Sequence, residues 1–282
     1  MQILRKLKKI LTNKKVVYGI LILIAILFSF FIIRGCTRNP SLKKSVYLIA
    51  RESPLQLELF GREKNIVAFV YDLIANIAEE NHLHLQWVET NPGHLTEGLD
   101  NGTYDFILTS LRPSIINQER YDLSEMILSL GPVLIVREES EISSLKELGE
   151  KPIGIAYGQT INYNALRTPG LNIYNLNLHY YTTMNRALED LTNDNIDGVI
   201  MPAIEAYAIV RGYYAGKLKV VTSPFIDEGL RIASFKNAGL EEIINLFNES
   251  INVMRKNGSY IKFIDKWNLV DPQSQYWHPA ET

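Results

Sequence analysis

The residues best suited to bind a small solute follow a short apolar run that ends at Thr109. Residues 106–108 read as a buried strand, and Thr109 and Ser110 place two hydroxyls directly after it. Arg112 and Arg120 follow within the next turn. Hydroxyls and free backbone amides at the carboxyl end of a strand are well placed to hold a small ligand. Guanidinium groups beside them favour a ligand with negative charge. The alternative is an ordinary strand-to-helix loop with solvated arginines. These residues alone do not distinguish a ligand site from such a loop, whereas features elsewhere in the chain do.

The composition narrows the classes of function. The chain has 282 residues, 46% of them hydrophobic, and a net charge of −2, which is typical of a globular protein. No run outside the N-terminus is strongly basic, so we expect no nucleic-acid partner. The histidines lack metal-ligand spacing, and the single cysteine allows no internal disulfide. Motifs of hydrolases, phosphate loops and zinc proteases are missing from the sequence. We therefore expect no enzyme activity, no metal and no cofactor.

The N-terminus predicts export and tethering. Residues 1–15 carry six basic side chains and no acid, and residues 16–33 form an unbroken apolar run of 18 residues. Such a run is long enough to span a bilayer, and its positive flank should stay inside. Cys36, after Gly35, resembles the cysteine of a lipobox and would then be lipidated, although Arg34 departs from the residue usual there. Otherwise the segment is an uncleaved signal anchor. Both interpretations leave the rest of the chain on the periplasmic side, anchored to the cell membrane.

Beyond a polar linker, strands alternate with helices. We expect strands at 45–50, 83–89, 104–110, 131–138, 152–158, 178–182, 197–201, 217–222 and 231–236. We expect helices at 67–81, 95–102, 142–149, from 160, and at 184–194, 203–216, 239–256 and 259–267. This order predicts an α/β fold with parallel sheets. A folded part of roughly 240 residues favours two lobes over one.

Several segments carry a resemblance to a known family. They are an apolar helix with Asp72 followed by a strand (67–88), the stretch that leads to Thr109 (95–111), Ser124, the stretch 142–160, and the closing stretch 257–267. In this order and spacing they resemble bacterial extracellular solute-binding proteins of family 3, the amino-acid receptors of import ABC transporters. The match covers most of the chain after the linker.

The resemblance implies a type II periplasmic binding protein-like fold, in which two α/β lobes are joined by a hinge and close on a ligand in the cleft between them. The crossover strands should lie near 131–136 and 223–229. The implied parts are a signal peptide or anchor (1–36), a linker (37–44), lobe 1 (45–134 and 230–267), lobe 2 (135–229) and a C-terminal tail (268–282).

The resemblance also indicates the ligand-binding residues. In lobe 2 they are Gly158, Gln159 and Thr160, where a helix N-terminus offers free N–H groups to an anion. Thr160 can alternatively serve only as a helix cap. In lobe 1, Arg51 and Ser53 follow the first strand, beside the hydroxyls of the third.

Two departures from the family pattern bear on the ligand. The arginine that binds the ligand carboxylate is replaced by Asn117, and Arg112 and Arg120 stand on either side of it. We favour Arg112 as the anchor because it directly follows the two hydroxyls, and Arg120 remains the alternative. The acid that pairs with the ligand ammonium is replaced by Pro202, and Glu205 either substitutes for it or is an ordinary solvated helix-start residue. An anionic or amino-acid-like solute is therefore expected.

The expected function is that of a membrane-tethered receptor for an ABC importer. Its partners would be a small solute (an amino acid or organic anion) and the transporter permease, and it would act as a monomer. A sensing receptor without transport, and a dehydratase-like enzyme on the same fold, are the alternatives.

Overall fold

The computed structural model describes residues 44–55, 61–156 and 176–272. The chain divides into two compact units, Met1–Lys44 and Ser45–Thr282, and every described helix and strand belongs to the second. The expected N-terminal membrane segment and Cys36 lie outside the described residues. Within the part that the structure describes, no helix has both the length and the apolar character that a membrane crossing requires.

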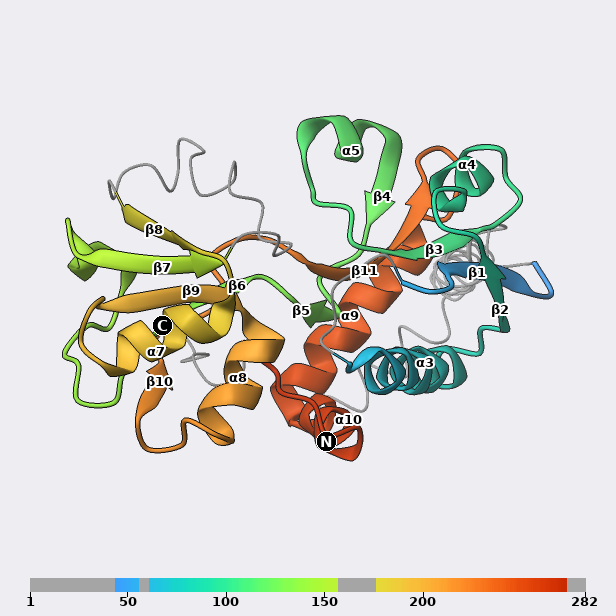
Figure 1. Cartoon of the computed structure of the whole chain (residues 1–282). Helices are drawn as coiled ribbons and strands as arrows, with labels where there is room; N and C mark the ends of the chain where they lie inside the picture. The colour runs from blue at the N-terminus through green and yellow to red at the C-terminus, as the bar shows by residue number, and fades with distance from the viewer. Residues whose placement is uncertain (1–43, 56–60, 157–175, 273–282) are drawn as a thin grey trace, which may run out of the picture. The chain divides into compact units, whose positions relative to one another are not determined.

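The first sheet has the strand order β2-β1-β3-β11-β4, with β5 paired to β11 (Figure 1). Its strands are β1 (Tyr47–Glu52), β2 (Leu85–Thr90), β3 (Phe106–Thr109), β4 (Tyr121–Leu123), β5 (Leu128–Ser129) and β11 (Gly229–Phe235). Its helices are α3 (Glu63–Glu80), α4 (Leu95–Asp100), α5 (Ile115–Arg120), α9 (Glu241–Asn257) and α10 (Ser259–Lys266). Strands β2, β1 and β3 run parallel, whereas β11 runs antiparallel to β3, β4 and β5.

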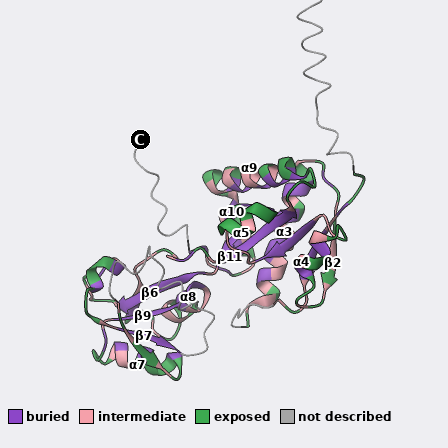
Figure 2. Cartoon of the chain, turned by 90° about the horizontal axis from the view of Figure 1, so that it is seen from above, coloured by how far each residue is buried: buried purple, intermediate pink, exposed green. Residues whose placement is uncertain are grey.

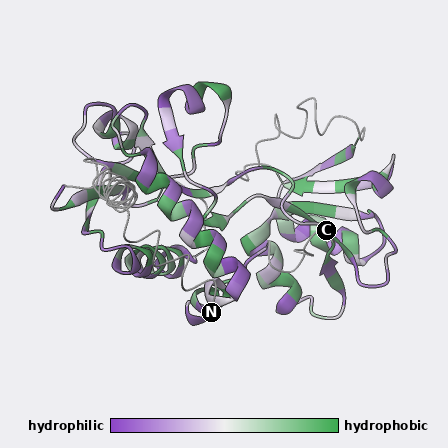
Figure 3. Cartoon of the chain, turned by 180° about the vertical axis from the view of Figure 1, so that it is seen from behind, coloured by the Kyte–Doolittle hydropathy of each residue, from purple (hydrophilic) through white to green (hydrophobic). Residues whose placement is uncertain are grey.

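The two faces of this sheet bury different side chains. Because successive residues of a strand point to opposite faces, Phe106 and Leu108 join the core under α3 and α9, and Ile107 joins the smaller core under α4. The central strands β3 and β11 are almost entirely buried (Figure 2). Helix α9 alternates hydrophobic and hydrophilic positions along its length, as expected for a helix that covers a sheet on one side (Figure 3).

The second sheet has the order β10-β6-β9-β7-β8. Its strands are β6 (Pro132–Arg137), β7 (Pro152–Ala156), β8 (Asn177–Tyr181), β9 (Gly198–Pro202) and β10 (Leu218–Val220). Helices α7 (Met184–Thr192) and α8 (Ala203–Arg211) cover one face, and the 3-10 turn η2 (Leu145–Leu148) contributes to the core of the other.

The chain passes between the sheets twice, and the two passages lie side by side. The first runs from β5 into β6, and the second runs from β10 into β11. The amides of Leu130 and Gly131 both donate to the carbonyl oxygen of Glu228, at 2.8 and 3.0 Å. A Cβ on Gly131 would lie 2.4 Å from the carbonyl oxygen of Ile226, so only glycine allows the passages to approach so closely.

The structure corrects three expectations about the elements. Both sheets are mixed rather than parallel, because β11 and β6, the strands that follow the two passages, run antiparallel to their neighbours. The helix expected at 142–149 is only the short turn η2. The turn expected after Thr109 contains α5, whose first turn is capped by Ser114 Oγ, which accepts from the amide of Asn117 at 3.2 Å.

Candidate functional site

Residues from two strands and one passage meet at the carboxyl end of β3. Because β11 runs antiparallel to β3, the first residues of β11 lie beside the last residues of β3, and Arg231 is directly opposite Thr109. The passage that carries Glu228 enters β11 just before this point. The loop from Ser110 to Arg112 leaves β3 at the same end. The register therefore assembles hydroxyls, guanidinium groups and carboxylates from distant parts of the chain.

The hydroxyls at this end are partly engaged. Thr109 is buried, and its Oγ1 accepts from the amide of Leu111 at 3.2 Å, which leaves the hydroxyl proton to donate elsewhere. Ser110 is half-buried. The two hydroxyls expected from the sequence therefore lie at the end of β3, and Thr109 stabilises the turn that follows.

Arg112 is held by its loop and by an acid of the passage. Its guanidinium Nη2 forms an ion pair with Glu228, and the two side chains are 32% and 22% exposed. Its carbonyl oxygen accepts from the amide of Ser114 at 2.7 Å and from Asn117 Nδ2 at 2.8 Å. The side chain of Asn117 thus holds the loop that presents Arg112.

Arg51 lies on the opposite face of the sheet from Thr109. The register pairs Ala50 with Ile107, so Arg51 shares the face of Leu108 and meets α3 instead of α5. Its Nε donates to Tyr71 Oη at 2.7 Å, its Nη1 donates to the carbonyl oxygen of Glu52 at 3.0 Å, and its Nη2 pairs with Glu89. This guanidinium joins β1, β2 and α3, and as a ligand contact Arg51 stays a prediction.

Arg120 belongs to a network on α4 and α5. It forms an ion pair with Asp100, and its own side chain is 57% exposed. Tyr121 Oη donates to the same carboxylate at 3.0 Å. Burial, and then the hydrogen bond to Asp100, raise the pKa of Tyr121. Of the two candidate anchors, Arg112 pairs with an acid of the passage, whereas Arg120 pairs with an acid of α4.

The remaining predicted contacts are spread over the chain. The amide of Ser53 donates to the carbonyl oxygen of Thr90 at 3.0 Å, and its side chain is half-buried. Glu205 lies in the first turn of α8, beside the second sheet, and is also half-buried. Residues 158–160 lie outside the described residues.

Arg231 and Asp227 were not among the site residues predicted from the sequence. Arg231 is 5% exposed, its Nη2 pairs with Asp227, and its Nη1 has no hydrogen-bond partner in the described part of the chain. A nearly buried guanidinium with an unsatisfied N–H lowers the free energy of unfolding. Its place beside Thr109 therefore makes Arg231 a candidate for the site. The sequence does carry a signal for them. The apolar run 229–235 contains one charged residue, Arg231, and two acids directly precede the run.

Asp72, part of the family motif, has a structural role. Its Oδ2 accepts from Lys266 Nζ and, at 3.1 Å, from Trp267 Nε1. The hydrogen bond from Lys266 is the main cause that lowers the pKa of Asp72. This contact joins α3 to the end of α10, the closing segment of the resemblance. Across the described ranges, no cluster of three metal-ligating side chains is present.

The comparisons with known proteins agree with this fold. The model of the bacterial extracellular solute-binding proteins, family 3, matches residues 52–270, so the chain belongs to that family and its function is solute binding. This result confirms the family expected from the sequence, and the solved structures below confirm the fold class.

Individual relatives match this chain at low sequence identity. A probable histidine-binding protein of Campylobacter jejuni is 26% identical over 214 residues, which is 74% of this chain and 80% of that protein. The glutamine-binding protein GlnH of Bacillus subtilis is 24% identical over 228 residues, 76% of this chain and 78% of that protein.

Two solved structures show the same fold. The unliganded, open L-cystine solute receptor of Neisseria gonorrhoeae matches with a TM-score of 0.58 and 17% identity, over 80% of this chain and 94% of that one. The second substrate-binding domain of Lactococcus lactis GlnP matches with a TM-score of 0.54 and 21% identity, over 80% and 96%. The fold is thus that of type II periplasmic binding proteins.

Proposed function

We propose that this chain is the receptor of an ABC importer for an amino-acid-like solute that carries a carboxylate. Membership of the family supports the class of protein, and relatives named as histidine-binding and glutamine-binding proteins support the class of solute. The relatives are solute-binding proteins rather than enzymes, and we propose no catalytic role for any residue.

The observation that carries the proposal is the ion pair between Arg112 and Glu228. A guanidinium can offer two parallel N–H groups to a carboxylate, and Glu228 already pairs with one of its nitrogens, Nη2. A solute carboxylate presents the same group and can take the place of Glu228. Arg112 then exchanges one carboxylate for another, and its charge is never left unpaired as the solute binds.

Neighbouring groups would complete the contact. The hydroxyl of Thr109 retains its proton, and Ser110 follows in the same turn. Arg231, opposite Thr109, adds positive charge that Asp227 already balances. In our proposal these groups hold the acidic end of the solute, and Glu205 and residues 158–160 of the second lobe hold its other end.

The lobes in this proposal keep the boundaries given above, with the two passages beside Gly131 as the hinge. Closure of the hinge would bring the two halves of the site together around the solute. The N-terminal segment 1–36 would tether the receptor outside the cytoplasmic membrane, by lipidation of Cys36 or as a signal anchor. The receptor would then deliver solute to a permease as a monomer.

A thermal-shift screen of the full chain against amino acids and organic acids tests the function. A solute at about 100 times its Kd adds roughly 2.7 kcal/mol of stability, or about 5–10 °C for a folded part of this size. Arg112→Gln should weaken the best solute by about 2–5 kcal/mol in calorimetry, because the carboxylate loses its partner. The exposed Arg186 on α7 supplies the matched control, Arg186→Gln, which should leave the affinity unchanged.

Glu228→Gln provides a test with the opposite sign. Because Glu228 competes with the solute for Arg112, its removal should raise the affinity for an anionic solute about fivefold, as expected for a partly exposed ion pair worth about 1 kcal/mol. Equal affinity in the parent and in Arg112→Gln, or a neutral sugar as the best solute, would contradict the proposal.

A further inference from the structure

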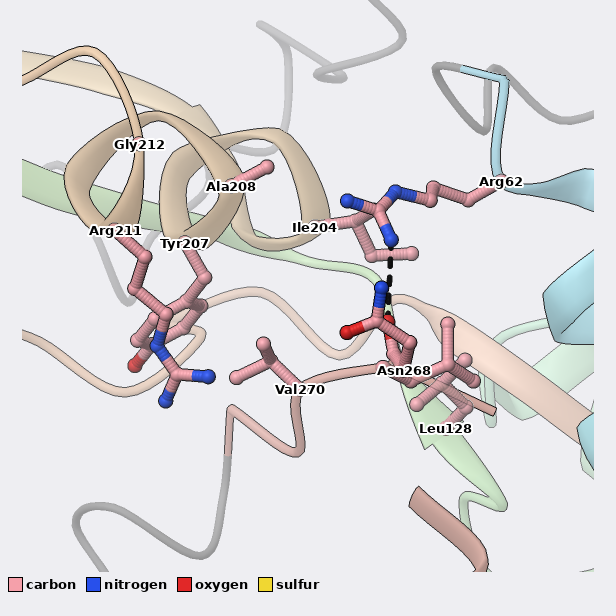
Figure 4. Close-up of a pocket in the computed structure, with 10 residues that line it drawn as sticks. Arg62, Leu128, Ile204, Tyr207, Ala208, Arg211, Gly212, Asn268 and Val270 are labelled. Carbon is pink, nitrogen blue, oxygen red and sulfur yellow. Dashed lines mark hydrogen bonds between the residues drawn. The ribbon is translucent and has the colours of Figure 1, made fainter. Parts of the chain in front are cut away.

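A cavity of about 200 Å³ lies between α8 and the C-terminal segment that follows α10. Ile204, Tyr207 and Arg211 of α8 form one side (Figure 4). Residues 268–270 and Arg62, just before α3, form the other. None of the residues at the carboxyl end of β3 lines this cavity, so it is not the site described above. Its volume is below the range of roughly 300–1,000 Å³ that is typical for drug-sized ligands, and suits a small molecule.

The contacts of the lining residues bridge the two cores. Ile204, on the helix that covers the second sheet, packs against the core of the first sheet. Val270, which follows the last helix of the first sheet, packs against the core of the second. The expected C-terminal tail therefore begins with a packed segment, which forms one wall of the cavity.

Two guanidinium groups border the cavity without a carboxylate partner in the described part of the chain. Arg62 Nη1 donates to the carbonyl oxygen of Asn268 at 3.1 Å, and this is the one hydrogen bond of its guanidinium in the described part of the chain. The guanidinium of Arg211 lies 5.9 Å from the centre of the Tyr207 ring. Arg112 and Arg231, in contrast, each pair with an acid. Arg62 is half-buried and Arg211 is exposed, so both can meet a ligand.

The rest of the lining is largely apolar. Figure 4 shows the side chain of Val270 between the two arginines, with Tyr207 beside Arg211 and Ile204 beside Arg62. Leu128 and Leu269 complete this surface. Apolar walls favour the body of a small organic molecule, and two cations without counter-charges favour an acidic group on it.

We propose that this cavity is a second binding site, which takes a small organic monocarboxylate with an apolar body. The carboxylate pairs with Arg62 or Arg211, and the aliphatic or aromatic body lies against Ile204, Tyr207 and Val270. The inference does not rest on the identity of the transported solute, because it shares no residue with the site at β3.

Benzoate and its neutral analogue benzamide test the proposal, with ligand-observed NMR on the full chain. The two probes have the same shape and differ in charge. We expect benzoate to bind with a Kd of about 1 mM, since a small ligand gains only a limited energy per atom. Benzamide should bind at least about fivefold more weakly, because it forms no ion pair.

Variants locate the bound probe. Arg62→Gln and Arg211→Gln should reduce benzoate affinity, by about fivefold or more for the residue that carries the ion pair, and leave benzamide unaffected. Arg186→Gln, on α7 and outside the lining of the cavity, is the matched control and should change neither. Ala208→Phe, which adds bulk to the lining while it keeps both charges, should abolish binding of both probes.

Specific results would overturn the assignment. They are benzamide binding as tightly as benzoate, benzoate binding unchanged in both the Arg62 and the Arg211 variant, and no binding of benzoate to the parent. Loss of benzoate binding in Arg112→Gln alone would place the probe at β3 and would also overturn it. Circular dichroism of each variant separates loss of binding from loss of fold.

Discussion

The hydroxyl of Ser124 takes the place of a backbone acceptor beside β11. Its removal therefore tests how much this one hydrogen bond stabilises the first sheet. Ser124 is 3% exposed and lies directly after β4, where β11 loses its regular partner. Its Oγ accepts from the amide of Ile232 at 2.9 Å and donates to the carbonyl oxygen of Glu125 at 2.8 Å. Its own amide donates to the carbonyl oxygen of Ile232 at 2.8 Å. The Ser124→Ala variant keeps the last of these bonds and loses the first two.

The cost follows from the buried amide that remains. In Ser124→Ala the N–H of Ile232 loses its acceptor, and an unsatisfied buried donor costs about 1–3 kcal/mol. For a folded part of this size, 1 kcal/mol lowers Tm by about 2–4 °C, so we expect a decrease of roughly 2–12 °C.

Ser234 supplies the matched control from β11 itself. It is fully buried, and its Oγ has no hydrogen-bond partner in the part of the chain that the structure describes. Ser234→Ala removes a hydroxyl that was buried without compensation, so the free energy of unfolding should stay the same or rise by up to about 1 kcal/mol.

Urea and thermal unfolding, followed by circular dichroism, measure both variants against the parent. We expect Ser124→Ala to unfold at a lower urea concentration than the parent, and Ser234→Ala to unfold at the same or a higher concentration. Equal shifts in the two variants, or a parent-like midpoint for Ser124→Ala, would refute the role assigned to this hydroxyl.

Two further predictions concern titrating groups. The pKa of Asp72 is lowered below its ordinary 3.8, so its contact with Lys266 stabilises the fold above about that pH and is lost as the pH falls through the lowered value. Asp72→Asn should therefore cost about 1 kcal/mol near neutral pH, and its urea midpoint should converge with that of the parent in acid; a difference independent of pH would contradict this. Burial, and then the hydrogen bond to Asp190, raise the pKa of Tyr181 to about 12. Its protonated form therefore favours the fold below the ordinary value of 10.0, and this contribution is lost as the pH rises from there through about 12. In phenolate absorbance, the difference between the parent and Tyr181→Phe should titrate near that value, and in an Asp190→Asn background it should titrate lower; a midpoint near 10 in the parent would refute the assignment.

The sequence alone determined the family and the order of most helices and strands, although it did not indicate α5, β4 or β5. Residues 106–108 are apolar and end at two hydroxyls, and the structure places β3 there. Helical spacing of apolar residues indicated α3, although the helix begins four residues before the expected 67. These features are local, because propensity, periodicity and turn chemistry act over a few neighbouring residues. The limits of such rules are visible at 142–149, where the expected helix forms only η2.

Tertiary structure alone decided which charged groups meet. Arg51 and Thr109 lie near the carboxyl ends of neighbouring strands, but the register sets them on opposite faces, and a shift of one residue would reverse this. Arg231 comes to lie opposite Thr109 only because β11 returns antiparallel to β3. Asp72 meets Lys266 across 194 residues of chain. Such contacts depend on strand register and on packing between distant segments, and no local pattern in the sequence encodes them.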